Sequence, residues 1–333
     1  PRIRSAGCAL LAGVGPERFI LMRRWRLMVV VFTAHFTACV GSQDDLSQVV
    51  DLRVLGMAFS APESMAPDCN PRNPASLASL NAPLTLSTLI ADPKGAGRPL
   101  EYTLRTCVRQ DDRICGNEGQ YIEIARGTLD AGVSTLAPFT LGTRTLPAPV
   151  SEGGSGLFLE EVRAANAFAV LGGLRVPLVL DVSAGDERIY AQKLMVFNCP
   201  IVPGMNQNAN PQLQGIRLDG EPWPENGLRT LTGGRGVFEL EDFAGFEEQY
   251  VVPSFELQPI TLTEAWKVAW HTSMGRLSPT ETGGVDQGGQ VSRHKTTWTP
   301  GANPKEGPVT FWFVVRDGRG GESWTSRSGY YVP

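Results

Sequence analysis

Histidines are the side chains in this chain best suited to acid–base chemistry, and their placement argues against that role. His271 lies on the polar side of an alternating strand pattern, and His294 lies in a Gly/Ser/Thr-rich loop, so both are predicted to be surface residues. The zinc motif HExxH and the nucleophile motif GxSxG are absent, as are the phosphate-binding patterns GxxxxGK(S/T) and GxGxxG after a strand. We therefore predict no catalytic residue.

Pairs of adjacent carboxylates are the other candidates for chemistry: Asp44 and Asp45, Asp111 and Asp112, Glu160 and Glu161, and Glu247 and Glu248. A glycosidase needs two carboxyl groups facing each other across a cleft, whereas adjacent strand residues point to opposite faces. These pairs are predicted to be solvated charge. Calcium bound by loop oxygens is the weaker alternative, because no DxDxDG run occurs. The prediction is no metal site and no cofactor.

Four cysteines that follow Cys39 are predicted to form two disulfides: Cys69, Cys107, Cys115 and Cys199. Four cysteines allow three connectivities. Cys107 and Cys115 bracket a polar loop, VRQDDRI, so we favour pairing them with each other and Cys69 with Cys199. The rival interpretation is a zinc site, but there is no CxxC pair and no nearby histidine.

Tryptophans are concentrated late in the chain, at positions 223, 266, 270, 298, 312 and 324. A stacked aromatic face can bind carbohydrate, but sandwich cores also hold tryptophan, and core packing is the favoured interpretation. Trp223 lies between Pro222 and Pro224 and is predicted to be exposed, which makes it the candidate ligand contact. Its replacement by alanine is then expected to leave the melting temperature nearly unchanged.

Residues 22–39 (MRRWRLMVVVFTAHFTAC) have the pattern of an export signal. Three arginines lead into an apolar run over 27–36, and the small residues Thr37 and Ala38 precede Cys39. The run is too short to span a bilayer, which takes about 20 apolar residues. The segment resembles a lipoprotein signal in which Cys39 is acylated (as with palmitate) and becomes the mature N-terminus, although Phe36 replaces the usual leucine. An ordinary signal peptide or a buried apolar segment is the alternative.

Charge and length bound the remaining possibilities. Six of the 30 Lys and Arg residues and one of the 34 Asp and Glu residues precede Cys39, so the chain from Cys39 onward has a formal net charge of −9. An acidic chain without a basic run gains nothing from counterion release on phosphate backbones, so nucleic-acid binding is not expected. Because Met22 begins the signal, residues 1–21 are interpreted as a mis-called upstream extension.

Short apolar runs between Gly, Pro, Asn and Asp clusters predict an all-β sandwich architecture. Strands are expected over residues 52–59, 84–91, 100–105, 176–182 and 193–198, and then over 214–218, 237–240, 260–262, 265–272 and 309–317. Residues 157–171, with their charges, alanines and a following Gly pair, suit a short helix, with a strand pair as the alternative. Trp266, Val268 and Trp270 should point inward from a half-buried strand, and residues 310–315 should form a central strand covered on both sides.

The predicted organisation has six parts. They are the extension 1–21, a lipoprotein signal peptide 22–38, a polar tether 39–48, a first β-sandwich domain 49–200 with a short helical insertion, a proline- and asparagine-rich extended linker 201–211, and a second β-sandwich domain 212–333. The two halves also share a pattern of apolar strand, Asp, Gly-rich turn with Arg and return strand, at residues 90–104 and 310–324.

The second half resembles bacterial Ig-like and polycystic-kidney-disease-like (PKD-like) modules. The matching positions are Trp270, residues 298–301 (WTPG), residues 311–315 and residues 317–321 (DGRGG). The resemblance covers about the last 130 residues well and residues 52–199 more loosely. Taken with the signal, the chain is similar to a myxobacterial-type surface lipoprotein with tandem Ig-like domains. Such motifs specify a fold and not an activity.

The leading hypothesis is therefore a non-enzymatic, lipid-anchored protein of the cell envelope that presents Ig-like domains for binding or scaffolding. Its partners would be the lipid bilayer, through acylated Cys39, and an envelope protein or polysaccharide. Val40 after the cysteine offers no aspartate-type inner-membrane retention signal, so the resemblance favours the outer membrane. A carbohydrate-binding or adhesive module is the second hypothesis, and an enzyme is the third.

Overall fold

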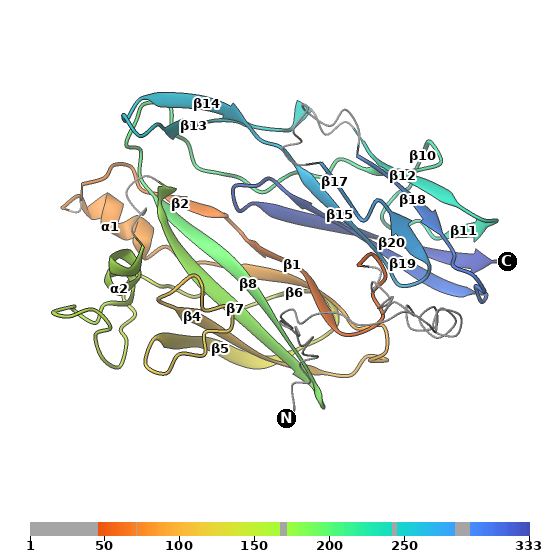
Figure 1. Ribbon diagram of the computed structural model, residues 1–333, viewed down its shortest axis with the longest axis horizontal. Helices are drawn as coiled ribbons and strands as arrows, with labels where there is room; N and C mark the ends of the chain where they lie inside the picture. The colour runs from red at the N-terminus through yellow and green to blue at the C-terminus, as the bar shows by residue number, and fades with distance from the viewer. Residues whose placement is uncertain (1–45, 71, 167–171, 242–244, 284–293) are drawn as a thin grey trace, which may run out of the picture. The chain divides into compact units, whose positions relative to one another are not determined.

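The computed structural model describes residues 46–333 except 71, 167–171, 242–244 and 284–293. The signal segment, Cys39 and residues 1–21 lie outside the described residues. Asp44–Pro333 forms one compact unit. Its described part contains twenty strands and two short helices (Figure 1), which confirms the all-β prediction. No helix in this described part is both long and apolar enough to cross a membrane.

The first sandwich packs a three-stranded sheet against a five-stranded sheet. The smaller sheet has the order β1 (Arg53–Phe59), β3 (Leu86–Ala91), β6 (Gly132–Thr135). The larger sheet has the order β2 (Glu63–Met65), β8 (Glu187–Asn198), β7 (Leu174–Ala184), β4 (Leu100–Cys107), β5 (Tyr121–Leu129). Aliphatic and phenylalanine side chains from both sheets, among them Phe59, Leu104 and Val182, fill the core between them.

The second sandwich consists of two five-stranded sheets. One has the order β10 (Glu221–Pro222), β9 (Ile216–Leu218), β12 (Gly236–Leu240), β18 (Lys295–Thr299), β16 (Arg276–Ser278). The other has the order β11 (Arg229–Thr232), β20 (Glu322–Val332), β19 (Gly307–Arg316), β15 (Lys267–Thr272), β17 (Glu281–Gly283). A separate two-stranded hairpin is formed by β13 (Gln249–Pro253) and β14 (Pro259–Thr263). Each of the ten expected strands overlaps an observed one.

Alternating residues of β15 and of the position just before it place the tryptophans of this region in the core, as predicted. Trp266 and Trp270 are 1% and 0% exposed, and Val268 between them is also buried. The prediction for β19 is confirmed as well. Phe311 and Phe313 point into the core of the second sandwich, while Val314 lies in a different apolar cluster on the opposite face of the sheet. A strand that is covered on both faces has a nearly continuous apolar sequence, as β19 does.

Two short helices cover one end of the first sandwich. The helix α2 (Phe158–Ala165) confirms the expected helix over those residues, and residues 167–171 of the expectation lie outside the described part. The helix α1 (Pro74–Leu80) was not expected. Its first turn is stabilised by the side chain of Asn73, which accepts a hydrogen bond from the backbone N–H of Ala75 at 3.0 Å, and proline occupies the first helical position.

Both predicted disulfides are present. Cys69 and Cys199 connect the loop before α1 to the end of β8, with Cα atoms 5.2 Å apart. Cys107 and Cys115 close the loop after β4, with Cα atoms 5.4 Å apart. The longer loop constrains the unfolded chain more, so the first bridge contributes more to stability in the chain-entropy description.

The internal similarity expected between residues 90–104 and 310–324 is not a structural repeat. The strands β19 and β20 form a hairpin, with Thr310 opposite Ser328 and Arg316 opposite Glu322. The strands β3 and β4 instead belong to different sheets. The shared Asp and Gly residues mark a turn in each case, but a turn does not determine whether the chain stays in its sheet or crosses to the facing one.

An apolar cluster joins the two sandwiches. Leu55 and Leu89 on β1 and β3 pack with Ala269 and Val314 on β15 and β19, and the ring of Trp324 lies against them. Gly56 is required here, because a Cβ at this position would come within 2.7 Å of the Trp324 ring. The part of the outer face of this sheet around Ala269 and Val314 is therefore covered by the first sandwich.

The segment that leads into the first sandwich is also attached to the second. Ser47 and Val49 are completely buried, and the N–H of Val49 donates to the carbonyl of Thr272 at 2.8 Å. In return the N–H of Thr272 donates to the carbonyl of Ser47 at 2.8 Å. Ser47 and Gln48, which were expected in the polar tether, thus lie against β15.

Trp223 corrects the sequence interpretation. It was predicted to be an exposed ligand contact, but it is 1% exposed and lies in the second sandwich, stacked on Phe238 with the ring centroids 5.9 Å apart. Its indole N–H donates to the carbonyl of Gly227 at 2.6 Å. The flanking prolines indicate a loop, but the ring packs inside the core against Phe238 and Phe311.

We therefore expect Trp223→Ala to destabilise the protein strongly. Truncating a buried tryptophan removes apolar contacts and leaves a cavity, which costs about 3–5 kcal/mol of unfolding free energy. Phe255→Ala is the matched control, because Phe255 is 91% exposed and should change stability by less than about 0.5 kcal/mol. Chemical denaturation of both variants measures the difference, and equal stabilities would contradict the burial of Trp223.

Candidate functional site

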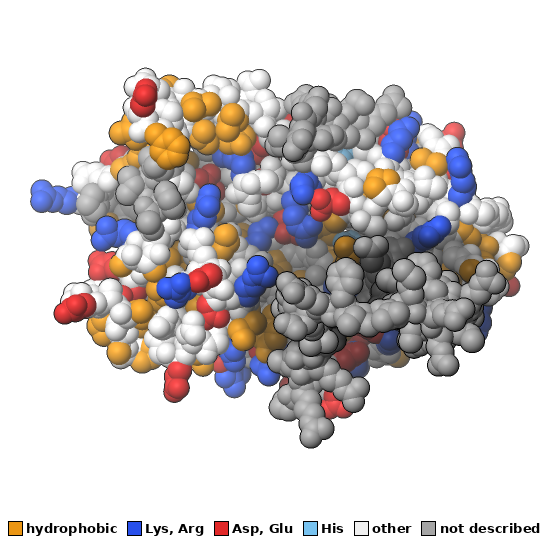
Figure 2. Space-filling model, in the orientation of Figure 1, with side chains coloured by type: hydrophobic (Ala, Val, Ile, Leu, Met, Phe, Trp, Pro, Cys, Tyr) orange, Lys and Arg blue, Asp and Glu red, His pale blue; other side chains and the backbone are white. Residues whose placement is uncertain are grey.

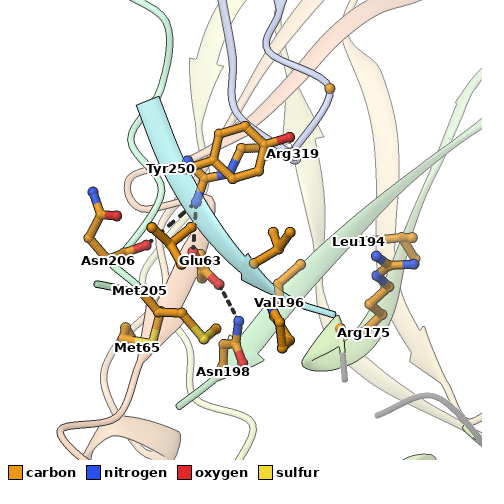
Figure 3. A pocket seen from close by; sticks show the side chains of 16 residues that line it. Glu63, Met65, Arg175, Leu194, Val196, Asn198, Met205, Asn206, Tyr250 and Arg319 are labelled. Carbon is orange, nitrogen blue, oxygen red and sulfur yellow. Dashed lines mark hydrogen bonds and ion pairs between the residues drawn. The ribbon is translucent and has the colours of Figure 1, made fainter. Parts of the chain in front are cut away.

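A groove of about 450 Å³ opens where the first and second sandwiches meet (Figure 3). The first sandwich contributes residues of β2 and β8, and the second side contributes β13 and the turn between β19 and β20. Met205 and Asn206, from the segment that connects the two sandwiches, line it as well. Gly172 and Arg175, at the start of β7, complete the lining, so six separate parts of the chain meet in this groove.

Glu63 is the acidic group at the base of the groove. It is 6% exposed and begins β2, which pairs in parallel with β8. One carboxylate oxygen accepts a hydrogen bond from the side-chain amide of Asn198 at 2.9 Å, and the other accepts from the backbone N–H of Asn208 at 2.8 Å. A buried carboxylate needs such partners, because an unpaired buried charge is very costly.

Arg319 supplies the positive charge that faces this acid. Its guanidinium lies 3.7 Å from the carboxylate of Glu63 and 3.5 Å from that of Glu264, and its side chain is only 14% exposed. The guanidinium also stacks on the ring of Tyr250, at 4.1 Å from the ring centroid, as Figure 3 shows. A planar guanidinium can pair with carboxylates and stack on an aromatic face simultaneously, which a lysine cannot do equally well.

Asp317 orients the turn that carries Arg319. Its carboxylate accepts hydrogen bonds from the backbone N–H groups of Arg319 at 2.6 Å and Gly321 at 2.9 Å. It also accepts from the side-chain amide of Asn208 at 2.8 Å. The DGRGG motif therefore forms a turn whose shape is set by its own aspartate, and Asn208 bridges that turn to Glu63.

The carboxyl group of Glu264 lies in the same cluster. It is 4% exposed, and the indole N–H of Trp266 donates to it at 3.1 Å. Burial raises its pKa above the ordinary value, and the hydrogen bond from Trp266 opposes this effect. Repulsion from Asp317 and Glu248 adds to the increase in pKa. Among the described residues, Arg319 pairs with three acids at once. Its guanidinium lies within 4 Å of the carboxylates of Glu63, Glu248 and Glu264.

A second buried ion pair connects the two sandwiches beyond the groove. The ammonium of Lys193 on β8 lies 2.7 Å from the carboxylate of Glu322 on β20, with the side chains 11% and 4% exposed. Arg316 also binds Glu322, at 2.8 Å, and it donates to the carbonyl of Leu55 at 3.0 Å. These contacts lie beside the apolar cluster around Leu55 and Trp324.

The groove has the chemistry of a binding surface. Its walls combine apolar side chains, among them Met65, Val196 and Val251, with the amides of Asn198 and Asn206 and the exposed guanidinium of Arg175. Its lining includes no histidine, cysteine, serine or threonine, and its lining acid, Glu63, is already engaged by three partners. This arrangement can hold a ligand through hydrogen bonds and one accessible cation.

The predicted site residues do not come together in this groove. Cys39 lies outside the described residues, and Trp223 is in the core of the second sandwich. Of the acidic pairs, only Glu247 and Glu248 contribute to the cluster: the carboxylate of Glu247 accepts from the N–H of Trp266 at 3.1 Å, and Glu248 lies 3.9 Å from Arg319. Within the described part of the chain, no three His, Cys, Asp or Glu side chains form a group that could hold a metal ion.

The histidines are not simple surface residues. His294 is 1% exposed, and its Nδ1 lies 3.1 Å from the hydroxyl of Thr282. His271 is half-buried beneath the segment that begins at Leu46, and its Nδ1 has no hydrogen-bond partner among the described residues. Burial lowers the pKa of each to about 4, and for His271 the charges of Arg53 and Arg316 lower the pKa further. The surface prediction is wrong for His294.

Comparisons with known proteins find only distant structural similarity, without a family or a curated relative. No protein-family profile matches the chain, and no curated protein matches its sequence. Among solved structures, the two tandem V-type regions of VCBP3, a v-region-containing chitin-binding protein, are 8% identical and cover 84% of this chain and 100% of theirs, with a TM-score of 0.25. A chimeric titin Z1Z2 tandem is also 8% identical and covers 85% of this chain and 100% of its own, with a TM-score of 0.21.

Two larger proteins match in the same way. Red sea bream transglutaminase is 7% identical, with 86% of this chain and 32% of the enzyme covered and a TM-score of 0.23. A Salmonella alpha-2-macroglobulin mutant is 10% identical, with 87% of this chain and 17% of the macroglobulin covered and a TM-score of 0.24. This chain thus spans a third or less of those two proteins. Similarity at this level assigns no family, activity or ligand.

Replacing Arg319 should weaken the junction between the sandwiches. Arg319→Met removes the cation but keeps an apolar stem, and it leaves Glu63 and Glu264 as buried acids without their counter-charge, so we expect a loss of about 3 kcal/mol of unfolding free energy. Arg126→Met is the control, since Arg126 pairs with Glu123 and is 73% exposed. That variant should lose less than about 1 kcal/mol. Similar losses measured by urea denaturation would contradict the role given to Arg319.

His294 should make the protein acid-sensitive. The pKa of His294 is about 4 in the folded protein and about 6.5 in the unfolded chain. The unfolded chain therefore binds a proton more readily, and the unfolding free energy falls as the pH drops from 6.5 toward 4. The slope approaches about 1.4 kcal/mol per pH unit between these values. His294→Gln should flatten the dependence of unfolding free energy on pH between 6 and 5, even if it lowers stability at pH 7. An unchanged slope would show that His294 titrates normally.

Proposed function

We propose that this chain is a non-enzymatic, lipid-anchored protein of the cell envelope, attached through acylated Cys39, that presents its two Ig-like β-sandwiches as one rigid binding or scaffolding body. The sequence supports the anchor through the basic, apolar and small-residue pattern of residues 22–39. Three acyl chains at about 0.8 kcal/mol per buried CH₂ would hold the protein far more firmly than one chain. The outer membrane is the proposed location.

The observation that carries the proposal is the burial of charge between the sandwiches. Lys193 and Glu322 form an ion pair across the junction with little exposure, and Glu63, Asn208 and Asp317 connect the first sandwich to the turn that carries Arg319. Reorienting the sandwiches would expose or separate these groups. A body that cannot bend at its middle suits a protein that presents a fixed surface, and the groove at the junction is its proposed binding surface.

The body also begins close to the proposed anchor. Ser47 is buried against β15, so eight peptide units separate it from Cys39. At no more than about 3.6 Å per residue, they span at most about 29 Å. The proposed protein is therefore held near the membrane surface, and its partner is expected to be another envelope protein or a polysaccharide at that surface.

Carbohydrate adhesion through exposed tryptophans is the second candidate. Tryptophans 223, 266, 270 and 298 are buried and cannot stack on a sugar. Trp312 and Trp324 are partly buried against the apolar cluster between the sandwiches. The exposed aromatic with the largest accessible fraction among the described residues is Phe255, at 91%. The enzymatic alternative has no arrangement in the groove that favours it.

Membrane fractionation of cells that express the full chain tests the anchor. We expect the native protein in the membrane fraction and Cys39→Ser in the soluble fraction, because the substitution removes the thiol that would be acylated. Cys8→Ser is the matched control and should stay in the membrane fraction, since it precedes the proposed start at Met22. Mass spectrometry of the N-terminal peptide should find a lipid-modified Cys39.

A soluble native protein with an unmodified thiol at position 39 would refute the anchor. It would leave the description of the two-sandwich body intact, because that rests on contacts within residues 46–333. Finding Arg18 in the mature protein would instead refute the interpretation of residues 1–21.

A further inference from the structure

The groove between the sandwiches runs along one edge of the strand β13. Four consecutive residues of this strand line the groove, from Tyr250 to Pro253, whereas the described lining includes no residue of β14. Consecutive strand residues point their side chains to opposite faces, so a surface that touches all four lies along the edge of the strand. The other edge of β13 is paired with β14. Figure 2 shows the side of the molecule on which this hairpin lies.

The hydrogen bonds of the hairpin determine which backbone groups of β13 face the groove. Where the hairpin turns, the N–H of Ser254 donates to the carbonyl of Gln258 at 2.8 Å. Because hydrogen-bonded pairs alternate along an antiparallel ladder, Val252 and Tyr250 also bond to β14. Val251 therefore directs both its N–H and its carbonyl toward the groove. Neither group has a hydrogen-bond partner within the described part of the chain.

An outward N–H and carbonyl on one strand residue are complementary to an extended polypeptide chain. A segment beside β13 accepts a hydrogen bond from the N–H of Val251 and donates one to its carbonyl, whichever way the segment runs. The next outward residue is Pro253, which has no N–H and whose ring would meet a carbonyl of the segment. The pairing therefore stops before Pro253, and the groove accommodates only a short segment.

The wall that faces β13 is apolar. Leu194 and Val196 are two residues apart on β8, so they share one face of their sheet, and Met65 on the adjoining strand β2 lines the groove with them (Figure 3). When a peptide adds to a strand edge, its backbone hydrogen bonds supply affinity and the side-chain contacts supply selectivity. These three residues provide contacts for apolar side chains of such a segment.

Arg175 determines the charge that the groove prefers. It lies directly opposite Val196 in the ladder between β7 and β8, so the two side chains share a face. Its guanidinium is exposed and forms no ion pair with another described residue. Glu63 and Arg319, in contrast, are paired with each other. Arg175 and Pro253 also line a neighbouring hollow together, so this cation lies near the end of β13 where the pairing stops. Its complement is a carboxylate.

The same lining disfavours a polysaccharide. Tyr250 is the one aromatic residue among the described lining residues, and the guanidinium of Arg319 covers its ring at 4.1 Å from the centroid. A sugar in this groove therefore has no open aromatic face to stack on. The carboxylate of Glu63, which could accept hydrogen bonds from sugar hydroxyls, is already engaged by Asn198, Asn208 and Arg319.

We infer that the groove binds a short, extended segment of another protein, which pairs with the backbone of Val251 and carries an acidic side chain bound by Arg175. This inference rests on the proposed use of the groove as a binding surface, and it selects a protein partner over a polysaccharide. The backbone pairing accepts any extended chain, so the acidic side chain and its apolar neighbours supply the specificity. The lipid anchor takes no part in this contact.

An array of random six-residue peptides, acetylated and amidated at their ends, tests the charge preference. The full chain, purified in detergent, should select Asp or Glu at one position of the peptides it binds. Arg175→Glu should select Lys or Arg at that position, because it reverses the charge. Arg126→Glu is the matched control and should keep the acidic preference, since Arg126 is 73% exposed and does not line the groove. An acidic preference that survives Arg175→Glu would overturn the proposal.

The best peptide from the array then tests the strand pairing in solution, by fluorescence polarisation. Val251→Pro should weaken binding at least about tenfold, because it removes the outward N–H and places a ring on the edge, where a strand tolerates proline. Val251→Thr keeps the N–H and the branched shape, so it should change the affinity less than about threefold. If Val251→Pro fails to fold, methylation of single peptide nitrogens replaces it. Methylation should abolish binding only at paired positions, and equal effects at every position would contradict strand pairing.

Oligosaccharides distinguish a failure of this inference from a failure of the proposed function. Tetrasaccharides of glucose or N-acetylglucosamine that bind the native chain but not Val196→Arg would keep the groove as a binding surface and overturn the peptide. Absence of binding by both the peptides and the saccharides would reject the groove as a binding surface. The lipid anchor is judged separately, by membrane fractionation.

Discussion

The pairing of buried charges across the junction is the interaction on which the rest of the structure depends. Glu63 and Glu322 are each less than one-tenth exposed, and each is paired with a cation from the facing sandwich, Arg319 and Lys193 respectively. Charges removed from water stay ionised only when their partners remain in place. Leu55, Leu89, Ala269 and Val314 form an apolar cluster between the same sheets, so packing and charge pairing favour one arrangement of the two sandwiches.

The connecting segment takes part in this junction. Sequence composition predicted an extended linker at residues 201–211, and residues 201–215 do form no strand. Its asparagines nevertheless bind both sides: Asn208 contacts Glu63 and Asp317, while Asn210 donates to the carbonyl of Phe59 and accepts from the N–H of Glu322. Asparagine can donate and accept at once, and this explains how a segment without regular structure fixes the two sandwiches together.

The sequence predicted the elements better than their assembly. Alternation around Trp270, the apolar run of β19 and the cysteine spacing are local patterns, and each led to a correct strand or disulfide. Burial of Trp223 and His294 depends on which sheet covers them, and no local pattern contains that information. The groove could not be found for the same reason, because Glu63 and Arg319 become neighbours only after both sandwiches have folded and docked. A useful signal was the DGRGG turn, whose arginine is unusual for a tight turn and whose aspartate orients it.

The attachment of Ser47 and Val49 to β15 determines how mechanical load enters the protein. Tension on the chain before residue 47 reaches β15 of the second sandwich first, through the two reciprocal hydrogen bonds with Thr272. The first sandwich is shielded, although it follows directly in the sequence. A pull from the N-terminal side must therefore detach residues 47–49 from β15 before it can stretch β1. The hydrogen bonds of this segment break first and protect the first sandwich from the load.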